Sequence, residues 1–463
     1  MKKLVGVLCT ALLLNASDVT ISNSLTLDVA LDILKSENLE IRAASLDVDS
    51  AKAEVKTASG NHWGKLDFVQ DYANSDDAGN VFGFKLTSRE AEFADFGFDE
   101  FFDAWNSGGL ATPAGQQKLL TTQPDKLNYP EARDFFQSTL KYEVPIFTGF
   151  QISSYENIMN AMTKMKTLEK TQVINEKIYE VRKSFYDMAL LRNSTKNLTT
   201  ILENIETLEN MTKNMIKVGY AKKVDLLEVK AKKGNVERLI TQMDSNQKLL
   251  YHYISFLLNK QVTSIETPSS EVPMPLCSDD EILNSNLDIQ RAKTGLEVRQ
   301  SMVDLSKSSY YPMVGAFAQI ATADDTFLGD ADDHKAYTVG ARLTWNIFNG
   351  GIDNAKVEKS RLDHLKTKTQ VQLAKKGIAL KIAKTRTEIE TANAEIVSLK
   401  KELDLANAIY ENYEGRYREK LSSMSDVIIK QSEQIQKILQ LQMAQNKRNE
   451  RIFALEKLAN GEK

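Results

Sequence analysis

Two long stretches of the sequence contain no proline, and they constrain the fold more than any other feature. The eight prolines leave residues 146–267 and 313–463 uninterrupted. Proline breaks a helix because its ring clashes with the preceding turn and its nitrogen donates no hydrogen bond. Both stretches can therefore hold helices far longer than the three or four turns usual in globular proteins.

Apolar residues recur in both stretches at alternating steps of four and three, the spacing of a coiled-coil seam. In the second stretch the seam consists of Ile378, Ile382, Thr385, Ile389, Ala392, Ile396, Leu399, Leu403, Ala406, Tyr410, Tyr413 and Tyr417. In the first it consists of Ile178, Val181, Phe185, Met188, Leu198, Leu202, Ile205, Leu208, Met211 and Met215. The pattern predicts long helices over 151–217, 225–258, 351–418 and 426–459. The longest would measure roughly 100 Å at 1.5 Å per residue.

Four shorter segments alternate apolar and polar residues, as half-exposed β-strands do. The alternation is clear at about 139–147 and 337–348 and weaker at about 65–72 and 310–321. A tilted strand of about 9–11 residues spans a bilayer, and transmembrane barrels turn their apolar face outward. The four segments therefore fit transmembrane strands, with a soluble four-stranded sheet beside a helical bundle as the alternative.

Four strands are too few to close a transmembrane barrel, which needs about 8. An open edge facing lipid would leave backbone N–H and C=O groups without partners. The chain would therefore borrow strands from copies of itself, and cyclic symmetry would close the ring. Two, three or four copies all give workable strand numbers, and composition does not choose among them.

The elements recur as an internal duplication, which is best sought before any other pattern. Asn-Leu-Glu-Ile at 38–41 resembles Asn-Leu-Asp-Ile at 286–289, and residues 142–149 match 343–350. Both halves run helix, strand, loop, strand, long helix, turn, helix. The two offsets differ, so the first half carries about 47 extra residues between its strands, within 73–136.

The N-terminus has the pattern of a secretory signal peptide. Two lysines precede an apolar run, and Leu14-Asn15-Ala16 offers a cleavage site. We therefore assign 1–16 to the signal peptide, 17–276 to the first structural repeat and 277–463 to the second. The exported chain would keep one cysteine, Cys277, and so no internal disulfide.

Composition and motifs exclude several classes of function. The net charge of −4 gives no reason to expect a nucleic-acid partner, and a mean hydropathy of −0.36 excludes a polytopic helical membrane protein. The four histidines are scattered, and no metalloprotease, P-loop, dinucleotide-binding or nucleophile-elbow motif occurs. We expect no enzyme activity, no cofactor and no metal. The acidic segment 324–333 lacks the spacing of an EF-hand, and we interpret it as a solvated loop.

The whole pattern resembles the TolC-like outer-membrane efflux protein family. The resemblance covers the exported chain and rests on the duplication and on the strand-to-helix junctions Ile-Phe-Thr-Gly at 146–149 and Ile-Phe-Asn-Gly at 347–350. It also rests on the turns Val-Gly-Tyr…Asp at 218–225 and Glu-Lys-Leu…Asp at 419–426. It implies a mainly α fold with a β-barrel part, in which a homotrimer forms a 12-stranded outer-membrane barrel continuous with a periplasmic helical tunnel.

The resemblance further implies a passive exit duct, gated at its periplasmic end, of a tripartite efflux or type I secretion system. Its partners would be a periplasmic adaptor protein, an inner-membrane RND or ABC pump, and outer-membrane lipid. A soluble periplasmic coiled-coil scaffold or adaptor without a channel is the alternative of a different class.

The resemblance places Asp225, Tyr417 and Asp426 near the inner end of the tunnel, where they are gate candidates. Three-fold symmetry would make Asp426 a ring of carboxylates that attract cations and repel one another. Asp225 and Asp426 could equally be plain helix N-caps, and Tyr417 could simply pack in the seam.

The turns between the long helices are candidate contacts for an adaptor, although any coiled-coil turn looks similar. The residues are Val218, Gly219, Tyr220, Lys420, Leu421 and Ser422. Gly219 can take the positive φ that ends a helix. Lys420 stands where the family has glycine, so we expect that geometry to be missing from the second turn. Ser422 and Ile429 replace an arginine and an aspartate found in some members, so we expect a different gate lock.

Three aromatic residues of the strands suit the belt that forms at a membrane–water interface. They are Tyr142, Tyr337 and Trp345. Ordinary strand residues would have the same pattern.

Overall fold

The computed structural model describes residues 24–109, 111–268, 271–329 and 333–460. The predicted signal peptide lies outside these residues. The chain divides into two compact units, each built from both sequence repeats. Of the described residues, the helical unit comprises those up to Ala51, those from Met162 to Leu296 and those from Lys366 onward, and the sheet unit comprises those in Lys52–Ala161 and Glu297–Leu365.

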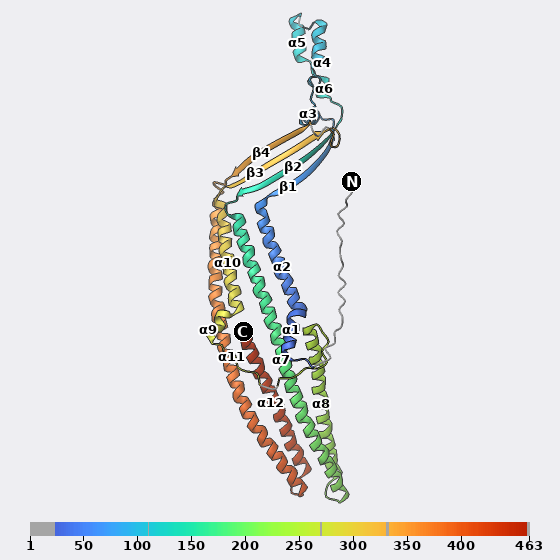
Figure 1. Ribbon diagram of the computed structural model, residues 1–463, viewed down its shortest axis with the longest axis vertical. Helices are drawn as coiled ribbons and strands as arrows, with labels where there is room; N and C mark the ends of the chain where they lie inside the picture. The colour runs from blue at the N-terminus through green and yellow to red at the C-terminus, as the bar shows by residue number, and fades with distance from the viewer. Residues whose placement is uncertain (1–23, 110, 269–270, 330–332, 461–463) are drawn as a thin grey trace. The chain divides into compact units, whose positions relative to one another are not determined.

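Four long helices form two hairpins (Figure 1). They are α7 (Gln151–Lys217), α8 (Lys223–Leu258), α11 (Ile352–Arg418) and α12 (Met424–Leu458). Both α7 and α11 run for 67 residues without interruption. The second helix of each hairpin begins two residues before the range expected from the sequence, because the capping residue lies further upstream than the aspartate.

The predicted seams form the core of the helical unit. One cluster brings Leu198, Ile205 and Leu208 of α7 against Val229 of α8 and Tyr410 of α11. A second cluster packs Val181, Phe185 and Met188 against Leu257 and Leu258. Burying one such side chain contributes about 1.5–3 kcal/mol. The seam therefore stabilises the hairpins, as its periodicity indicates.

Shorter helices flank the hairpins. They are α1 (Leu27–Glu37), α2 (Leu39–Gly60), α9 (Asp279–Ser285) and α10 (Leu287–Lys307). Each pair repeats a short helix followed by a longer one, as the duplication predicts. The turns η1 (Asn61–Trp63) and η4 (Ser308–Tyr310) follow the longer helices.

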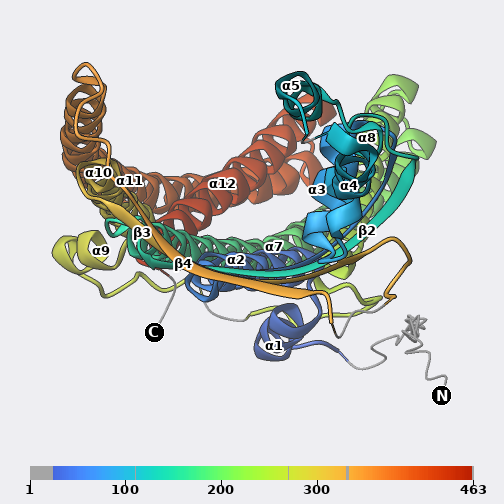
Figure 2. The same cartoon turned by 90° about the horizontal axis from the view of Figure 1, so that it is seen from above.

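The sheet unit holds one antiparallel sheet in the order β1-β2-β3-β4. Its strands are β1 (Lys65–Ser75), β2 (Arg133–Phe147), β3 (Met313–Asp324) and β4 (Lys335–Thr344). The strands bend along their length, which is clear from above (Figure 2). Leu66, Tyr142, Ala318 and Val339 stand in one row across the sheet.

The strand ends differ from those expected. Strand β2 begins at Arg133, because it stays paired with β1 as far as Ser75, and Phe135 stacks on Phe84 at 4.2 Å between ring centres. Strand β4 ends at Thr344, the partner of the first residue of β3. This first residue, Met313, follows Pro312, which has no N–H to donate to a neighbouring strand.

The segment between β1 and β2 is helical, so the expectation of a loop there was wrong. It contains α3 (Ala78–Thr87), η2 (Phe93–Phe96), α4 (Phe98–Ala104), η3 (Trp105–Gly109), α5 (Pro113–Thr121) and α6 (Asp125–Asn128). Phenylalanine rings hold it together, with Phe82 and Phe96 edge to face at 5.2 Å. Aromatic pairs of this kind contribute about 0.5–1.5 kcal/mol beyond their burial.

The strand-to-helix junctions take the same backbone form in both repeats. Gly149 and Phe150 have positive φ, as do Gly350 and Gly351. At Gly149 a Cβ atom would lie 2.7 Å from the carbonyl oxygen of Ser308. The junction therefore requires glycine at position 149. Among the described residues, no helix is both long and apolar enough to cross a membrane.

Candidate functional site

The first candidate site is the pair of turns that close the hairpins, residues 218–222 and 419–423, which we call the paired turns. Both end their first helix with the same hydrogen bonds. Gly219 N–H donates to Ile216 O at 3.1 Å, and Tyr220 N–H to Met215 O at 2.8 Å. In the second turn Lys420 N–H donates to Tyr417 O at 3.0 Å and Leu421 N–H to Arg416 O at 2.7 Å. This is the Schellman pattern, which satisfies the last carbonyls of a helix.

The expectation that a lysine would remove the left-handed geometry was wrong. Lys420 has a φ of 64°, close to the 81° of Gly219. The two hydrogen bonds of the turn impose the conformation, which costs a residue with a Cβ about 1–2 kcal/mol. The Lys420 ammonium lies 3.5 Å from the centre of the Tyr220 ring. This cation–π contact, worth about 0.5–1 kcal/mol at an exposed site, offsets part of that cost and links the two turns.

Asp225 and Asp426 lie in the first turn of α8 and α12, three residues after the N-cap. Each carboxylate accepts a hydrogen bond from the backbone of that N-cap residue. Asp225 Oδ2 accepts from the N–H of Lys222 at 2.8 Å. Asp426 Oδ2 accepts from the hydroxyl of Ser423 at 2.7 Å and from its N–H at 3.1 Å. These bonds hold the pKa of Asp426 below its usual value. The N-caps are thus Lys222 and Ser423. The prediction that Asp225 and Asp426 are themselves the N-caps was wrong.

Tyr417 is buried in the core beneath the paired turns. Met424 and Val427 of α12 belong to the same cluster. The Tyr417 hydroxyl lies 3.5 Å from Thr212 Oγ1, and burial raises the pKa of Tyr417. The residue therefore links α11 to α7 by packing and by one long polar contact.

The paired turns expose three large apolar side chains. Val218, Tyr220 and Leu421 are all about two-thirds exposed. Ser422 instead donates to the backbone carbonyl of Tyr413 at 3.2 Å, so its hydroxyl is used within the turn. Val224 and Leu227 extend the apolar surface along α8. Sequence analysis missed these two because they fall outside the turn, although their exposed position on α8 follows from the helical period.

Two polar contacts join α8 to α12 behind the turns, and sequence reasoning missed both. Ser425 donates to Glu228 at 2.8 Å, and Lys232 donates to Ser432 at 2.6 Å. Burial lowers the pKa of Lys232. The hairpins are thus tied to each other within one chain.

The second candidate site is the sheet, whose two faces differ in polarity. One face carries exposed apolar side chains on all four strands, namely Leu66, Phe68, Tyr72, Leu140, Tyr142, Ile320, Tyr337, Val339 and Leu343. Tyr142 donates its hydroxyl to the carbonyl of Trp63 at 2.7 Å, and Trp345 donates its indole N–H to the carbonyl of Tyr310 at 3.2 Å. Tyr337 lies on the same face, and Trp345 follows the end of β4.

The opposite face is hollowed and carries charged side chains. A cavity of about 520 Å³ is lined by Lys141, Glu143 and Arg342, among others. Lys141 pairs with Glu143 at 2.6 Å. The Phe317 ring covers Gly340, where a Cβ atom would lie 2.6 Å from the ring. Charged side chains therefore line this cavity together with apolar ones, among them Phe147 and Phe317.

Both edges of the sheet are open within the described part of the chain. Strand β1 pairs only with β2, and β4 only with β3. Exposed edges of this length present rows of unpaired N–H and C=O groups and are templates for pairing with another chain.

Comparison with known proteins agrees with this geometry. Residues 280–461 match the model of a family described as outer membrane efflux protein. Among curated proteins there is no significant sequence match.

Several solved structures share the fold. CusC, from a study of transmembrane channel formation, superposes with a TM-score of 0.76 at 12% identity, covering 94% of this chain and 92% of that one. The outer membrane protein VceC of Vibrio cholerae gives 0.74 at 14%, covering 94% and 96%. The CmeC outer membrane channel of Campylobacter jejuni gives 0.73 at 13%, covering 94% and 85%. The resemblance inferred from the sequence is confirmed, and the mainly helical fold with a small antiparallel sheet is that of these channels.

Proposed function

Residues 280–461 of this chain match the outer membrane efflux protein family, and on the strength of this match we propose that three copies assemble into a gated export duct. The protein is an outer-membrane efflux channel that extends into the periplasm. In the proposed trimer, the four strands of each copy form a 12-stranded barrel, and the long helices form a tunnel continuous with it.

The open edges of the sheet support closure by further copies. Neighbouring strands run antiparallel, and each chain contributes an even number of them. Strand β4 of one copy therefore runs opposite to β1 of the next, and an all-antiparallel ring closes without a break. Closure satisfies the backbone groups of both edges, which lipid cannot do.

The two faces of the sheet support its orientation in that ring. The apolar face would contact lipid, and the face with Lys141, Glu143 and Arg342 would line the lumen. Tyr142, Tyr337 and Trp345 would then form the aromatic belt. Two of them use their polar atoms on backbone carbonyls, so their rings stay fixed at the apolar face.

The continuous helices α7 and α11 support a duct that reaches far from the membrane. Each has 67 residues, or roughly 100 Å at 1.5 Å per residue. We assign one α-β-β-α-α repeat to 17–276 and the other to 277–463. Neither repeat closes a barrel alone, so we treat them as halves of one duplicated unit.

The gate is proposed to lie at the paired turns. Asp225 and Asp426 hold the starts of α8 and α12, and Tyr417 packs beneath them. Three copies of the exposed Asp426 would form a carboxylate ring that binds cations and restricts flow. The contact between Lys420 and Tyr220 would hold the two turns of each chain together where an arginine lock is absent.

The exposed surface of the paired turns is the proposed contact for a periplasmic adaptor. Val218, Tyr220 and Leu421 supply its apolar part, and Gly219 and Lys420 fix the backbone; Ser422 is turned inward. Such an adaptor would join the duct to an energised inner-membrane pump of the RND or ABC type, in a tripartite efflux or type I secretion system. The duct itself would conduct passively.

Conductance in planar bilayers tests the channel and its gate together. The purified protein should give discrete channel events, and Asp426→Ala should raise single-channel conductance or abolish block by divalent cations. Asp404→Ala removes an exposed carboxylate from α11 and serves as the matched control, with no change expected. Unchanged conductance and block in Asp426→Ala would mean that Asp426 only stabilises the start of α12 and has no part in the gate. A water-soluble monomer without channel activity would favour the coiled-coil scaffold.

A further inference from the structure

We propose that Glu90, Asp324 and His334 form a binding site for one divalent transition-metal ion of the zinc class. The three residues lie in the sheet unit, far from the paired turns in sequence. Asp324 is the last residue of β3, His334 immediately precedes β4, and Glu90 follows α3. The interpretation of 324–333 as a wholly solvated loop was wrong at its first residue, because Asp324 is buried.

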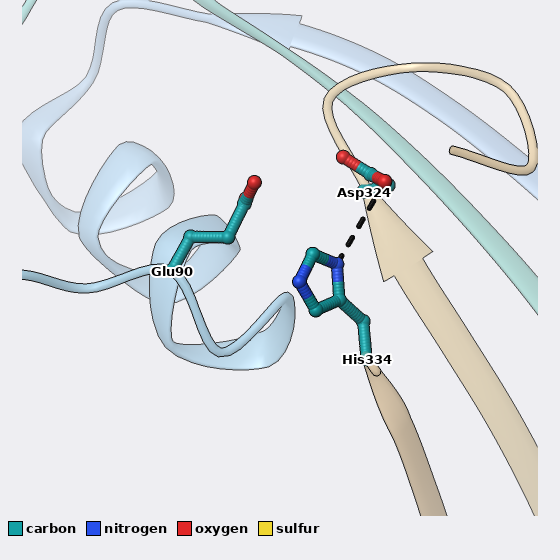
Figure 3. Close-up of side chains that lie close together, drawn as sticks. All are labelled: Glu90, Asp324 and His334. Carbon is teal, nitrogen blue, oxygen red and sulfur yellow. Dashed lines mark ion pairs between the residues drawn. The ribbon is translucent and has the colours of Figure 1, made fainter. Parts of the chain in front are cut away.

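The ligand atoms already converge. One nitrogen of His334 and one carboxylate oxygen each from Glu90 and Asp324 all lie within 4.8 Å of one another. The imidazole and the two carboxyl groups lie close together (Figure 3). Its Nδ1 is 3.7 Å from Asp324 Oδ2. This separation is too long for a hydrogen bond, but an ion between the two atoms would bridge it with two bonds of about 2.0–2.2 Å.

The imidazole supplies an independent sign of a missing ligand. His334 Nδ1 is buried and has no hydrogen-bond partner. The His334 side chain is 13% exposed and that of Asp324 is 10% exposed. A buried polar atom without a partner is costly and uncommon in native proteins. A metal ion at the convergence point would satisfy this nitrogen.

The charges around the site favour a dication. Glu90, Asp324 and Asp325 bring three carboxylates, while Arg133 brings one guanidinium, 3.8 Å from Asp325 and in contact with Glu90. With a neutral imidazole the group carries a net charge of −2, taking every carboxylate as ionised. One divalent ion would neutralise it.

The surroundings of Glu90 leave it able to act as a ligand. Arg133 contacts Oε2 of Glu90, and the Ser88 hydroxyl donates to the same oxygen at 2.6 Å. Both contacts orient the carboxylate and leave Oε1 for the ion. Hydrogen bonds of this kind around metal ligands fix their orientation and raise affinity.

The ligand set defines the class of metal. One imidazole and two carboxylates, with a fourth position for water, suit zinc and similar ions. Calcium and magnesium prefer sites made only of oxygen. Occupancy would join the helical segment after β1 to the β3–β4 connection. We therefore expect the ion to stabilise the sheet unit rather than to take part in conduction.

Zinc titration of the full-length protein, purified without a histidine tag and stripped with chelator, tests the proposal. Isothermal titration should give one zinc per chain, and zinc should raise the midpoint of thermal unfolding. His334→Ala and Asp324→Asn should weaken binding at least 10-fold, because even residues that only orient metal ligands contribute about 10- to 100-fold to affinity. His62→Ala is the control, because His62 faces the single carboxylate of Glu156 at 3.4 Å; its binding should match the wild type.

Cobalt(II) provides a readout that does not depend on stability. Bound cobalt should give visible d–d absorption that is lost in His334→Ala and retained in His62→Ala. Zinc binding that is absent in the wild type, or unchanged in a folded His334→Ala variant, would overturn the proposal. Equal binding of magnesium or calcium would also overturn it. None of these results would affect the proposed duct, which bilayer conductance tests separately.

Discussion

The side-chain amide of Asn38 donates a hydrogen bond of 2.7 Å to the backbone carbonyl of Leu257. Asn286 repeats this contact with Leu458 at 3.1 Å. The amide oxygens of both asparagines accept from the N–H three residues ahead, that of Ile41 or Ile289. Each asparagine therefore caps the helix that it begins and holds the end of the hairpin in its own repeat. This double role explains why Asn-Leu-x-Ile recurs in the sequence.

Removing either amide should destabilise the helical unit. Asn38→Ala and Asn286→Ala each leave buried backbone groups unpaired, at a cost of about 1–3 kcal/mol. Thermal unfolding in detergent, followed by circular dichroism, should show a lower midpoint for both variants. Asn412→Ala, at an exposed position of α11, is the control and should differ little from the wild type. Equal midpoints in all three variants would refute the double role.

Substituting alanine for glycine should have opposite effects at two positions. Gly219 has a φ of +81°, so Gly219→Ala should cost about 1–2 kcal/mol. Gly377 lies inside α11 with open space around its Cα, and Gly377→Ala should gain about 1 kcal/mol. Hydrogen–deuterium exchange should therefore quicken about 5- to 30-fold around residues 212–226 in the first variant. Slower exchange in Gly219→Ala would contradict the assigned turn.

The contact between Lys420 and Tyr220 should appear as a coupling energy. We expect a double-mutant cycle of Lys420→Asn and Tyr220→Leu to give about 0.5–1 kcal/mol. Asparagine tolerates the left-handed conformation, so the cycle separates lost contact from backbone strain. Local exchange at residues 416–424 is the measurement. Additive effects of the two changes would show that the turns are not linked by this pair.

The start of α12 should loosen in acid. Hydrogen bonds from the Ser423 hydroxyl and N–H hold the pKa of Asp426 below its ordinary value of 3.8. A carboxyl whose pKa is lowered by folding contributes its full stabilisation above the pKa of the unfolded chain, and this contribution is lost as the pH falls through the folded-state pKa. Exchange at residues 423–427 should therefore rise below about pH 4. Asp426→Asn should remove this pH dependence, and its persistence there would assign it to another group.

The long helices could be predicted because a single apolar period persists through each of them. The duplication then aligned the two turns, since Gly219 and Lys420 occupy equivalent places. The assumption that lysine would forbid the geometry failed because two backbone hydrogen bonds, rather than the side chain, determine the conformation of the turn.

The start of β2 and the proposed metal site depend on contacts between residues far apart in the sequence, which local patterns do not predict. The start of β2 is set by pairing with Ser75 and by the stacking of Phe135 on Phe84. The convergence of Glu90 with Asp324 and His334 joins residues more than two hundred positions apart, through a helical segment that has no counterpart in the second repeat. No motif based on residue spacing predicts such a site.

The central claim is that three four-stranded sheets close into one ring. Native mass spectrometry of the protein extracted from outer membranes in mild detergent measures the number of chains directly. A mass of three chains, reduced to one chain only on denaturation, is the predicted result. A monomer, or a stable assembly with another number of chains, would contradict it.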